Sequence, residues 1–101
     1  MNNSQVTSKI KIILIEDSID DVDLIILALK KSNLDYELTH VDQLDTLHAH
    51  LVRGEFDLVI SDYNLKTFNG LDVIKTVRSI DSVIPIIIAS GTVGEEQAVR
   101  L

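Results

Sequence analysis

Three acidic residues each follow a short apolar run, and their positions suggest shared chemistry. Glu16 and Asp17 follow the run at residues 11–15. Asp62 follows the run at residues 58–61. If both runs are neighbouring parallel strands, the three carboxylates meet at the sheet edge where ligands of open α/β sheets bind. Crowded carboxylates repel one another, and a hard divalent cation such as Mg²⁺ relieves that repulsion through oxygen ligands. The sequence therefore predicts a magnesium site.

An alternation of strands and helices is needed to position these acids. Apolar runs rich in β-branched residues predict buried strands. They span residues 10–15, 36–41, 56–61 and 83–89. Apolar residues at helical spacing predict helices that begin near Ser18, Leu44 and Gly70. Thr92 with Glu95 resembles a capping box and predicts a further helix. This alternation implies right-handed crossovers and a parallel sheet covered on both faces.

Composition narrows the classes of function. The chain has 101 residues, enough for one domain, and we expect residues 1–9 to form a flexible N-terminal segment before a domain at 10–101. A net charge of -7 disfavours direct contact with nucleic acid or anionic lipid. The absence of cysteine excludes disulfides and thiol catalysis. With no signal peptide and no apolar stretch long enough to span a membrane, we expect a cytoplasmic protein.

Three short motifs carry a resemblance to a known family. The segment at residues 16–18 resembles an acidic pair after a first strand, and residues 61–65, followed by Gly70, resemble a phosphoacceptor loop. Residues 87–92 resemble a fourth strand that ends in a hydroxyl residue, Ser90. Each motif is weak alone. In this order and at this spacing they resemble the receiver domain of two-component response regulators, over nearly the whole chain.

The resemblance implies a fold and a function. It implies a flavodoxin-like, doubly wound parallel sheet of order 2-1-3-4. Asp62 would accept a phosphoryl group from a sensor histidine kinase or a phosphotransfer domain, and the modified domain would switch its conformation for downstream signalling. Such a domain catalyses only its own phosphorylation and dephosphorylation, so it is not an enzyme in the usual sense.

The family also implies the ligands of the site. Mg²⁺ would be held by Glu16, Asp17, Asp62 and the backbone carbonyl of Asn64. We expect Asp17 to bind the ion directly and Glu16 to act through water. Ser90 would hydrogen-bond a phosphoryl oxygen after Asp62 is modified.

Two features of the family pattern are missing from this sequence. The chain stops before the fifth strand, which carries a lysine that pairs with the phosphoryl group, and before the last helix. We therefore expect a C-terminally incomplete domain whose strand at residues 84–89 forms an exposed edge. Exposed apolar edges pair with other chains, so the sequence predicts self-association there.

Other interpretations of the same residues remain open. Glu16 and Asp17 are acids that a following helix would favour at its N-terminus, Asp62 resembles an ordinary loop-starting residue, and Ser90 resembles a strand-end hydroxyl. We interpret a further set of acids as a solvated first helical turn: Asp20, Asp21 and Asp23.

Two other classes of protein fit part of the pattern. One is a pseudo-receiver, an interaction module not controlled by phosphorylation, and the complete set of acids argues against it. The other is a haloacid-dehalogenase-like phosphatase, which requires a second aspartate two residues after the nucleophile. Here that residue is Asn64.

Overall fold

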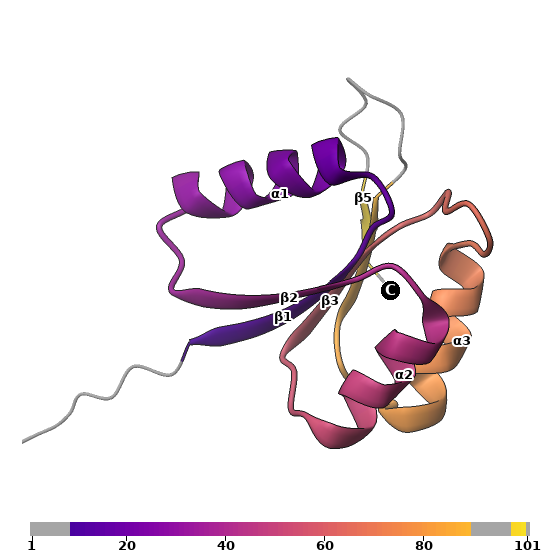
Figure 1. Ribbon diagram of the computed structural model, residues 1–101. Helices are drawn as coiled ribbons and strands as arrows, with labels where there is room; N and C mark the ends of the chain where they lie inside the picture. Colours follow the sequence, from indigo (N-terminus) through magenta and orange to yellow (C-terminus); the bar gives the residue numbers. More distant parts are fainter. Residues whose placement is uncertain (1–8, 90–97, 101) are drawn as a thin grey trace, which may run out of the picture.

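The computed structural model describes residues 9–89 and the backbone of residues 98–100, arranged as a sheet with helices on both faces (Figure 1). The elements in chain order are β1 (Ile10–Ile15), α1 (Ile19–Lys31), β2 (Tyr36–Val41), α2 (Leu44–Arg53), β3 (Leu58–Asp62), α3 (Gly70–Ile80), β4 (Ile86–Ala89) and β5 (Ala98–Arg100). The sheet order is β2-β1-β3-β4-β5. The first four strands are parallel, which confirms the predicted flavodoxin-like order 2-1-3-4.

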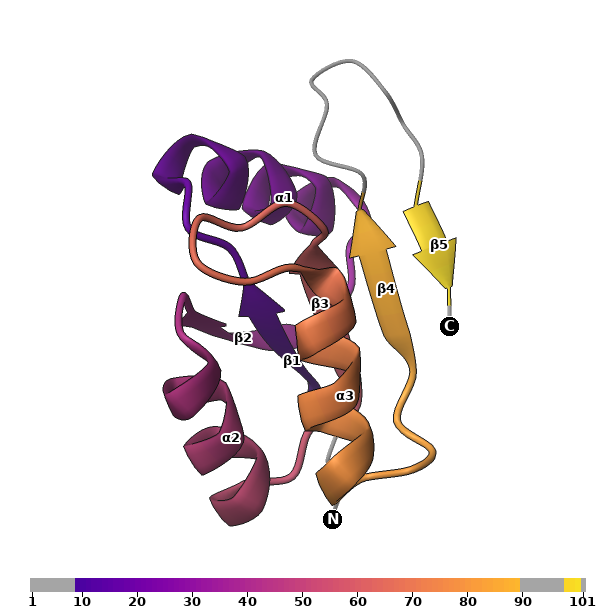
Figure 2. The same ribbon diagram turned by 90° about the vertical axis from the view of Figure 1, so that its right-hand side faces the viewer.

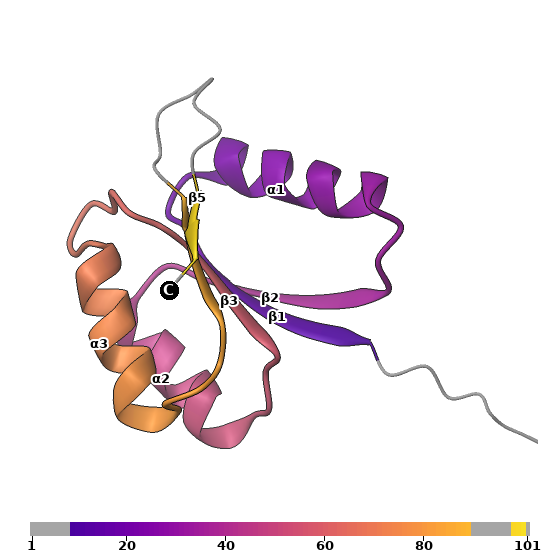
Figure 3. The same cartoon turned by 180° about the vertical axis from the view of Figure 1, so that it is seen from behind.

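Strand β1, between β2 and β3, is buried on both faces of the sheet. Helix α1 lies over one face, and α2 and α3 lie over the other (Figures 1 and 3). Ile13 and Ile15 join the apolar core with α2 and α3, whereas Ile12 and Leu14 point to the opposite face. All four side chains are fully buried. This explains why β1 reads as a continuous apolar run rather than an alternating one.

Two strands begin later than the apolar runs predict. β3 starts at Leu58. At Asp57, just before it, the backbone N–H donates to the Lys11 carbonyl at 2.7 Å, while the carboxylate, in place of a backbone carbonyl, accepts from the Lys11 N–H at 2.8 Å. β4 starts at Ile86 rather than at residue 83. The N–H groups of Val83 and Ile84 donate to the Asp81 carboxylate, at 2.9 and 3.1 Å, so they form a turn instead of a strand.

The C-terminal part of the chain differs from the prediction. We expected a helix after Thr92, but Ala98–Arg100 forms β5, which pairs antiparallel with β4 (Figure 2). The prediction that residues 84–89 form a free edge is therefore wrong, because β5 covers the outer side of β4. The unpaired backbone groups of a sheet edge favour such pairing over the local helical signal. Thr92 and Glu95, like residues 1–8 of the expected N-terminal segment, lie outside the described residues.

Crossing a membrane requires a long apolar helix, and none of the helices in the described part of the chain has the necessary length and apolar character.

Candidate functional site

Asp62 is the last residue of β3 and lies at the carboxyl edge of the parallel sheet. β3 is held on both sides, by β1 and by β4, and Asp62 itself pairs with Ala89. The Asp62 side chain is buried, with 7% of its surface exposed. Among the residues that the structure describes, no donor reaches its Oδ1 atom, which is also shielded from solvent. A buried carboxylate oxygen without a partner is costly, and such an atom requires a functional explanation.

Glu16 lies beside Asp62 because it directly follows β1. Its backbone N–H donates to the Val41 carbonyl at 3.1 Å, and its own carbonyl accepts from His40 Nε2 at 2.6 Å. These contacts tie Glu16 to β2 and fix its backbone at the sheet edge. The Ser18 N–H then donates to Glu16 Oε2 at 3.2 Å, which orients the carboxylate. The side chain is almost fully buried.

Three carboxylates meet at this edge: those of Glu16, Asp21 and Asp62. One oxygen of each lies within 4.8 Å of the others. Burial, followed by the charge of Asp62, raises the pKa of Glu16 from 4.5 to about 7. Burial also raises the pKa of Asp62, although the backbone N–H groups of Asn64 and Tyr63 act in the opposite direction. The cluster therefore resists carrying its full negative charge without a proton or a cation.

Asp17 faces a different partner from the one that we expected. Its Oδ2 atom accepts a hydrogen bond from the Lys66 N–H at 2.6 Å, which ties the end of β1 to the loop after β3. The group of mutually close carboxylate oxygens does not include Asp17. In this structure Asp17 holds the loop in position, and its role as a direct metal ligand stays a prediction.

The loop after Asp62 is closed by backbone contacts at its base. The Gly70 N–H donates to the Tyr63 carbonyl at 2.8 Å, and Asn64 forms a bridge with Asn69. A Cβ atom at Gly70 would lie 2.8 Å from the Tyr63 ring, so this close approach requires glycine. The closed loop presents Asn64 next to Asp62. That the Asn64 carbonyl binds the metal stays a prediction. Ser90, the predicted hydroxyl donor, lies outside the described residues.

Asp21 is the site residue that the sequence analysis missed. It was interpreted as a solvated acid of the first helical turn, but its carboxylate is part of the cluster with Glu16 and Asp62. One signal was available in the sequence. A residue in the third position of a helix that starts at the sheet edge lies near its N-cap, and here the N-cap is Ser18, two residues after Glu16.

The chemistry of these donors fits a hard divalent cation. All three groups are carboxylates, and oxygen ligands are those that Mg²⁺ and similar ions prefer. Nothing in the described part of the chain partners the buried Oδ1 atom of Asp62, and an ion would supply such a partner. Glu16, Asp21 and Asp62 are therefore able to hold such an ion.

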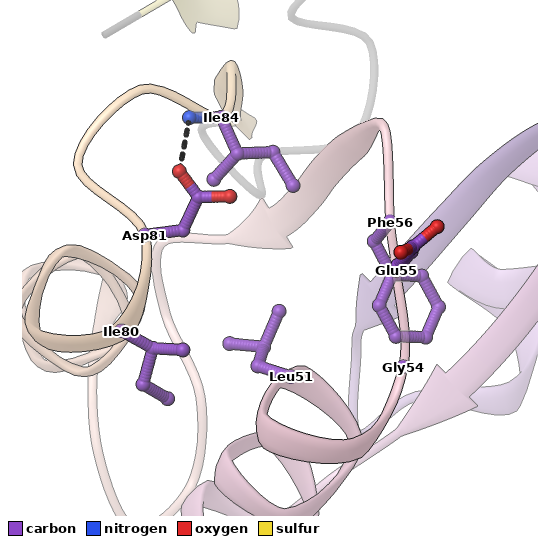
Figure 4. Close-up of a pocket in the computed structure, with 7 residues that line it drawn as sticks. All are labelled: Leu51, Gly54, Glu55, Phe56, Ile80, Asp81 and Ile84. Atoms are coloured by element: carbon purple, nitrogen blue, oxygen red, sulfur yellow. Dashed lines mark hydrogen bonds between the residues drawn. The ribbon is translucent and has the colours of Figure 1, made fainter.

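A separate hollow of about 240 Å³ lies at the opposite edge of the sheet, before β3 and β4 (Figure 4). Its lining combines the apolar residues Leu51, Phe56 and Ile80 with two acids, Glu55 and Asp81. The Asp81 carboxylate accepts hydrogen bonds from backbone N–H groups. Neither acid belongs to the group of three close carboxylates found among the described residues.

Comparison with known proteins identifies the family. The model of the response regulator receiver domain matches residues 12–101. The structure resembles a response regulator receiver protein from Pseudomonas putida, with 25% identity and a TM-score of 0.70, over 86% of this chain and 72% of that one. It also resembles the phosphorylated cyanobacterial phytochrome response regulator RcpA, with 28% identity and a TM-score of 0.65, over 86% of this chain and 69% of that one.

A third match shows the shared fold at lower identity. It is the response regulator TrrA, solved in complex with the histidine kinase ThkA. The identity is 20% and the TM-score 0.69, over 87% of this chain and 76% of that one. Taken with the match over residues 12–101, the sheet order and the acidic edge show that this chain belongs to the response regulator receiver domain family, whose members are signalling modules.

Proposed function

We propose that this receiver domain accepts a phosphoryl group on Asp62 and uses it as a reversible signal. The observation that carries the proposal is the Asp62 side chain itself, which is buried at the end of β3 beside two other acids and whose Oδ1 atom has no partner among the described residues. The phosphorylated state of RcpA, which this chain resembles, supports the same chemistry here.

The proposed donor is a phosphohistidine of a sensor histidine kinase or of a phosphotransfer domain. A carboxylate oxygen of Asp62 forms a bond to phosphorus, the P–N bond breaks, and its electron pair stays on the imidazole nitrogen. Hydrolysis of the resulting acyl phosphate returns Asp62 and releases inorganic phosphate. The complex of TrrA with ThkA supports a kinase as partner for this fold. We place the reaction in the cytoplasm, where kinases obtain ATP.

Mg²⁺ is the proposed cofactor, and when bound it would neutralise negative charge on the phosphoryl oxygens. The chain's own groups have the remaining tasks. Glu16, Asp17 and Asp62 are proposed to supply carboxylate oxygens, with Asp17 binding the ion directly and Glu16 through water. Asp17 also accepts from the Lys66 N–H, which ties it to the loop after β3. Asn64 is proposed to add its carbonyl oxygen. Ser90 is proposed to donate its hydroxyl to a phosphoryl oxygen.

Intact mass measurement tests the proposal directly. The protein is incubated with acetyl phosphate and Mg²⁺, beside Asp62→Asn and the exposed-acid control Asp23→Asn. We expect a single phosphoryl adduct in the wild type and in the control, removed by hydroxylamine, which cleaves acyl phosphates. An adduct that persists in Asp62→Asn would contradict Asp62 as acceptor. No adduct in any protein would instead favour a pseudo-receiver.

A further inference from the structure

Asp21 occupies a place in the acidic cluster that the helix-capping pattern does not explain. It is the third residue of α1, whose N-cap is Ser18. The Ser18 hydroxyl oxygen accepts from the Asp21 N–H at 3.4 Å, which is one half of a capping box. In the other half, the carboxylate of Asp21 would accept from the Ser18 N–H. Glu16 accepts that hydrogen bond instead, at 3.2 Å.

In helix α3, the N-cap residue and the third residue form a complete capping box. Its N-cap is Asn69 and its third residue is Asp72, so Asp72 matches Asp21 in position and type. Both halves of this box are present, with Asp72 N–H to Asn69 Oδ1 at 3.0 Å and Asn69 N–H to Asp72 Oδ2 at 3.1 Å. Of these two third-position acids, only Asp72 accepts a hydrogen bond from its N-cap within the described residues, and one carboxylate oxygen of Asp21 lies close to those of Glu16 and Asp62.

The Asp62 side chain gives an independent reason to place a ligand here. It is more than nine-tenths buried, and within the described ranges its Oδ1 atom has no hydrogen-bond partner. The carboxylate oxygens of the cluster lie within 4.8 Å of one another. Oxygens on opposite sides of one ion are about 4.2 Å apart for Mg²⁺ and about 4.6–5.2 Å apart for Ca²⁺, from their usual bond lengths. The limit of 4.8 Å lies in the Ca²⁺ range and is about 0.6 Å above the Mg²⁺ value, so a single ion can contact all three groups, for Mg²⁺ after a small inward shift of the side chains.

We infer that Asp21 is a further carboxylate ligand of the divalent cation in this pocket, beside Glu16 and Asp62. This inference rests on the proposed function, because it concerns the same site. It assigns Asp21 a role beyond that of the family's acidic pair. A third cluster carboxylate adds to the attraction for the cation before any phosphoryl group arrives.

Cation affinity of the unmodified protein tests the inference without any phosphorylation. Free Mn²⁺ is measured by electron paramagnetic resonance during titration of the whole chain, and Mg²⁺ affinity follows from competition. We expect Asp21→Asn to weaken Mn²⁺ and Mg²⁺ binding by about 10-fold or more. Asp20→Asn and Asp23→Asn remove the same charge from exposed positions of α1, where water and salt screen it. They should weaken binding by less than about 2-fold.

Asp72→Asn is a further control, since it alters the same position of another helix. A wild-type affinity in Asp21→Asn, with binding abolished in Asp62→Asn, would overturn the role of Asp21 and leave the proposed site intact. Absence of binding by the wild type would overturn both. If Asp21→Asn does not fold, the ¹³C shift of the Asp21 carboxyl group in the wild type decides. A shift that saturates with those of Glu16 and Asp62 during Mg²⁺ titration supports the inference, and an unchanged one refutes it.

Discussion

The Glu16→Gln substitution is expected to stabilise the cation-free protein at neutral and alkaline pH. Burial, then the charge of Asp62, raises the pKa of Glu16 from 4.5 to about 7. Each pKa unit corresponds to about 1.4 kcal/mol, so ionising this group costs the folded state about 3 kcal/mol relative to the unfolded chain. The side chain is only 3% exposed, so screening by solvent reduces the cost little.

The pKa values of Glu16 in the unfolded and the folded protein set the pH range of this effect. The folded protein holds a proton on Glu16 more tightly than the unfolded chain does. The stability that this provides is fully present below pH 4.5 and is lost as the pH rises to about 7. Glutamine does not ionise. The difference in unfolding free energy between Glu16→Gln and the wild type should therefore grow across this range and level off near about 3 kcal/mol.

Urea unfolding in EDTA, followed by circular dichroism at a series of pH values, measures this difference. Glu37→Gln, at an exposed position of β2, is the matched control and should show no comparable pH dependence. Saturating Mg²⁺ should remove the advantage of glutamine, because the ionised Glu16 then has a cation beside it. A difference independent of pH, or a loss of stability in Glu16→Gln at pH 8, would refute the electrostatic reasoning.

Three further predictions concern the loop after β3. Gly70→Ala should destabilise the protein by about 1–3 kcal/mol in urea unfolding, since the new Cβ meets the Tyr63 ring at 2.8 Å and the Tyr63 Cα at 3.2 Å; unchanged stability would contradict the packing. Asn69→Ala removes the N-cap of α3 and should cost about 1 kcal/mol in thermal unfolding, of which Asn69→Asp recovers most. Lys66→Pro removes the N–H that binds Asp17, so it should be less stable than Lys66→Ala by about 1 kcal/mol, and equal stabilities would argue against this contact.

Most of the sheet could be predicted because its signals are local. Residues 12–15 of β1 are all apolar since both faces of the strand are buried there, and the helices show one apolar face each. The late start of β4 could not be read from the apolar run. It depends on Asp81, which binds the N–H groups of Val83 and Ile84 and so competes with the ladder.

The C-terminal strand β5 shows a second limit of prediction from the sequence. The spacing of Thr92 and Glu95 is a genuine helix signal, but Ala98–Arg100 lies beside β4, whose outer backbone groups need partners. Tertiary pairing of this kind overrides local propensity, and nothing within the segment itself announces it.

The acids of the candidate site that lie at strand ends could be predicted from the sequence, but Asp21, which lies in a helix, could not. Glu16 and Asp62 follow apolar runs directly, so strand order alone brings them together. The place of Asp21 in the cluster depends on which carboxylate accepts the Ser18 N–H. Glu16 accepts it, because the sheet fixes the Glu16 backbone next to Ser18. The pattern at Ser18 and Asp21 is otherwise the same as that at Asn69 and Asp72, where the box closes.

The electrostatics of the pocket also explain why signalling through it should require a cation. Before modification, burial and mutual repulsion already raise the pKa values of Glu16 and Asp62. Phosphorylation would replace the single charge of Asp62 with nearly two negative charges at the same place. Without a cation, the added charge would be opposed by every carboxylate in the cluster. Within the described residues, burial leaves Asp62 Oδ1 without a partner, so under the proposed function the modified state would depend on an ion, and metal affinity, proton binding and phosphorylation would be linked in one pocket.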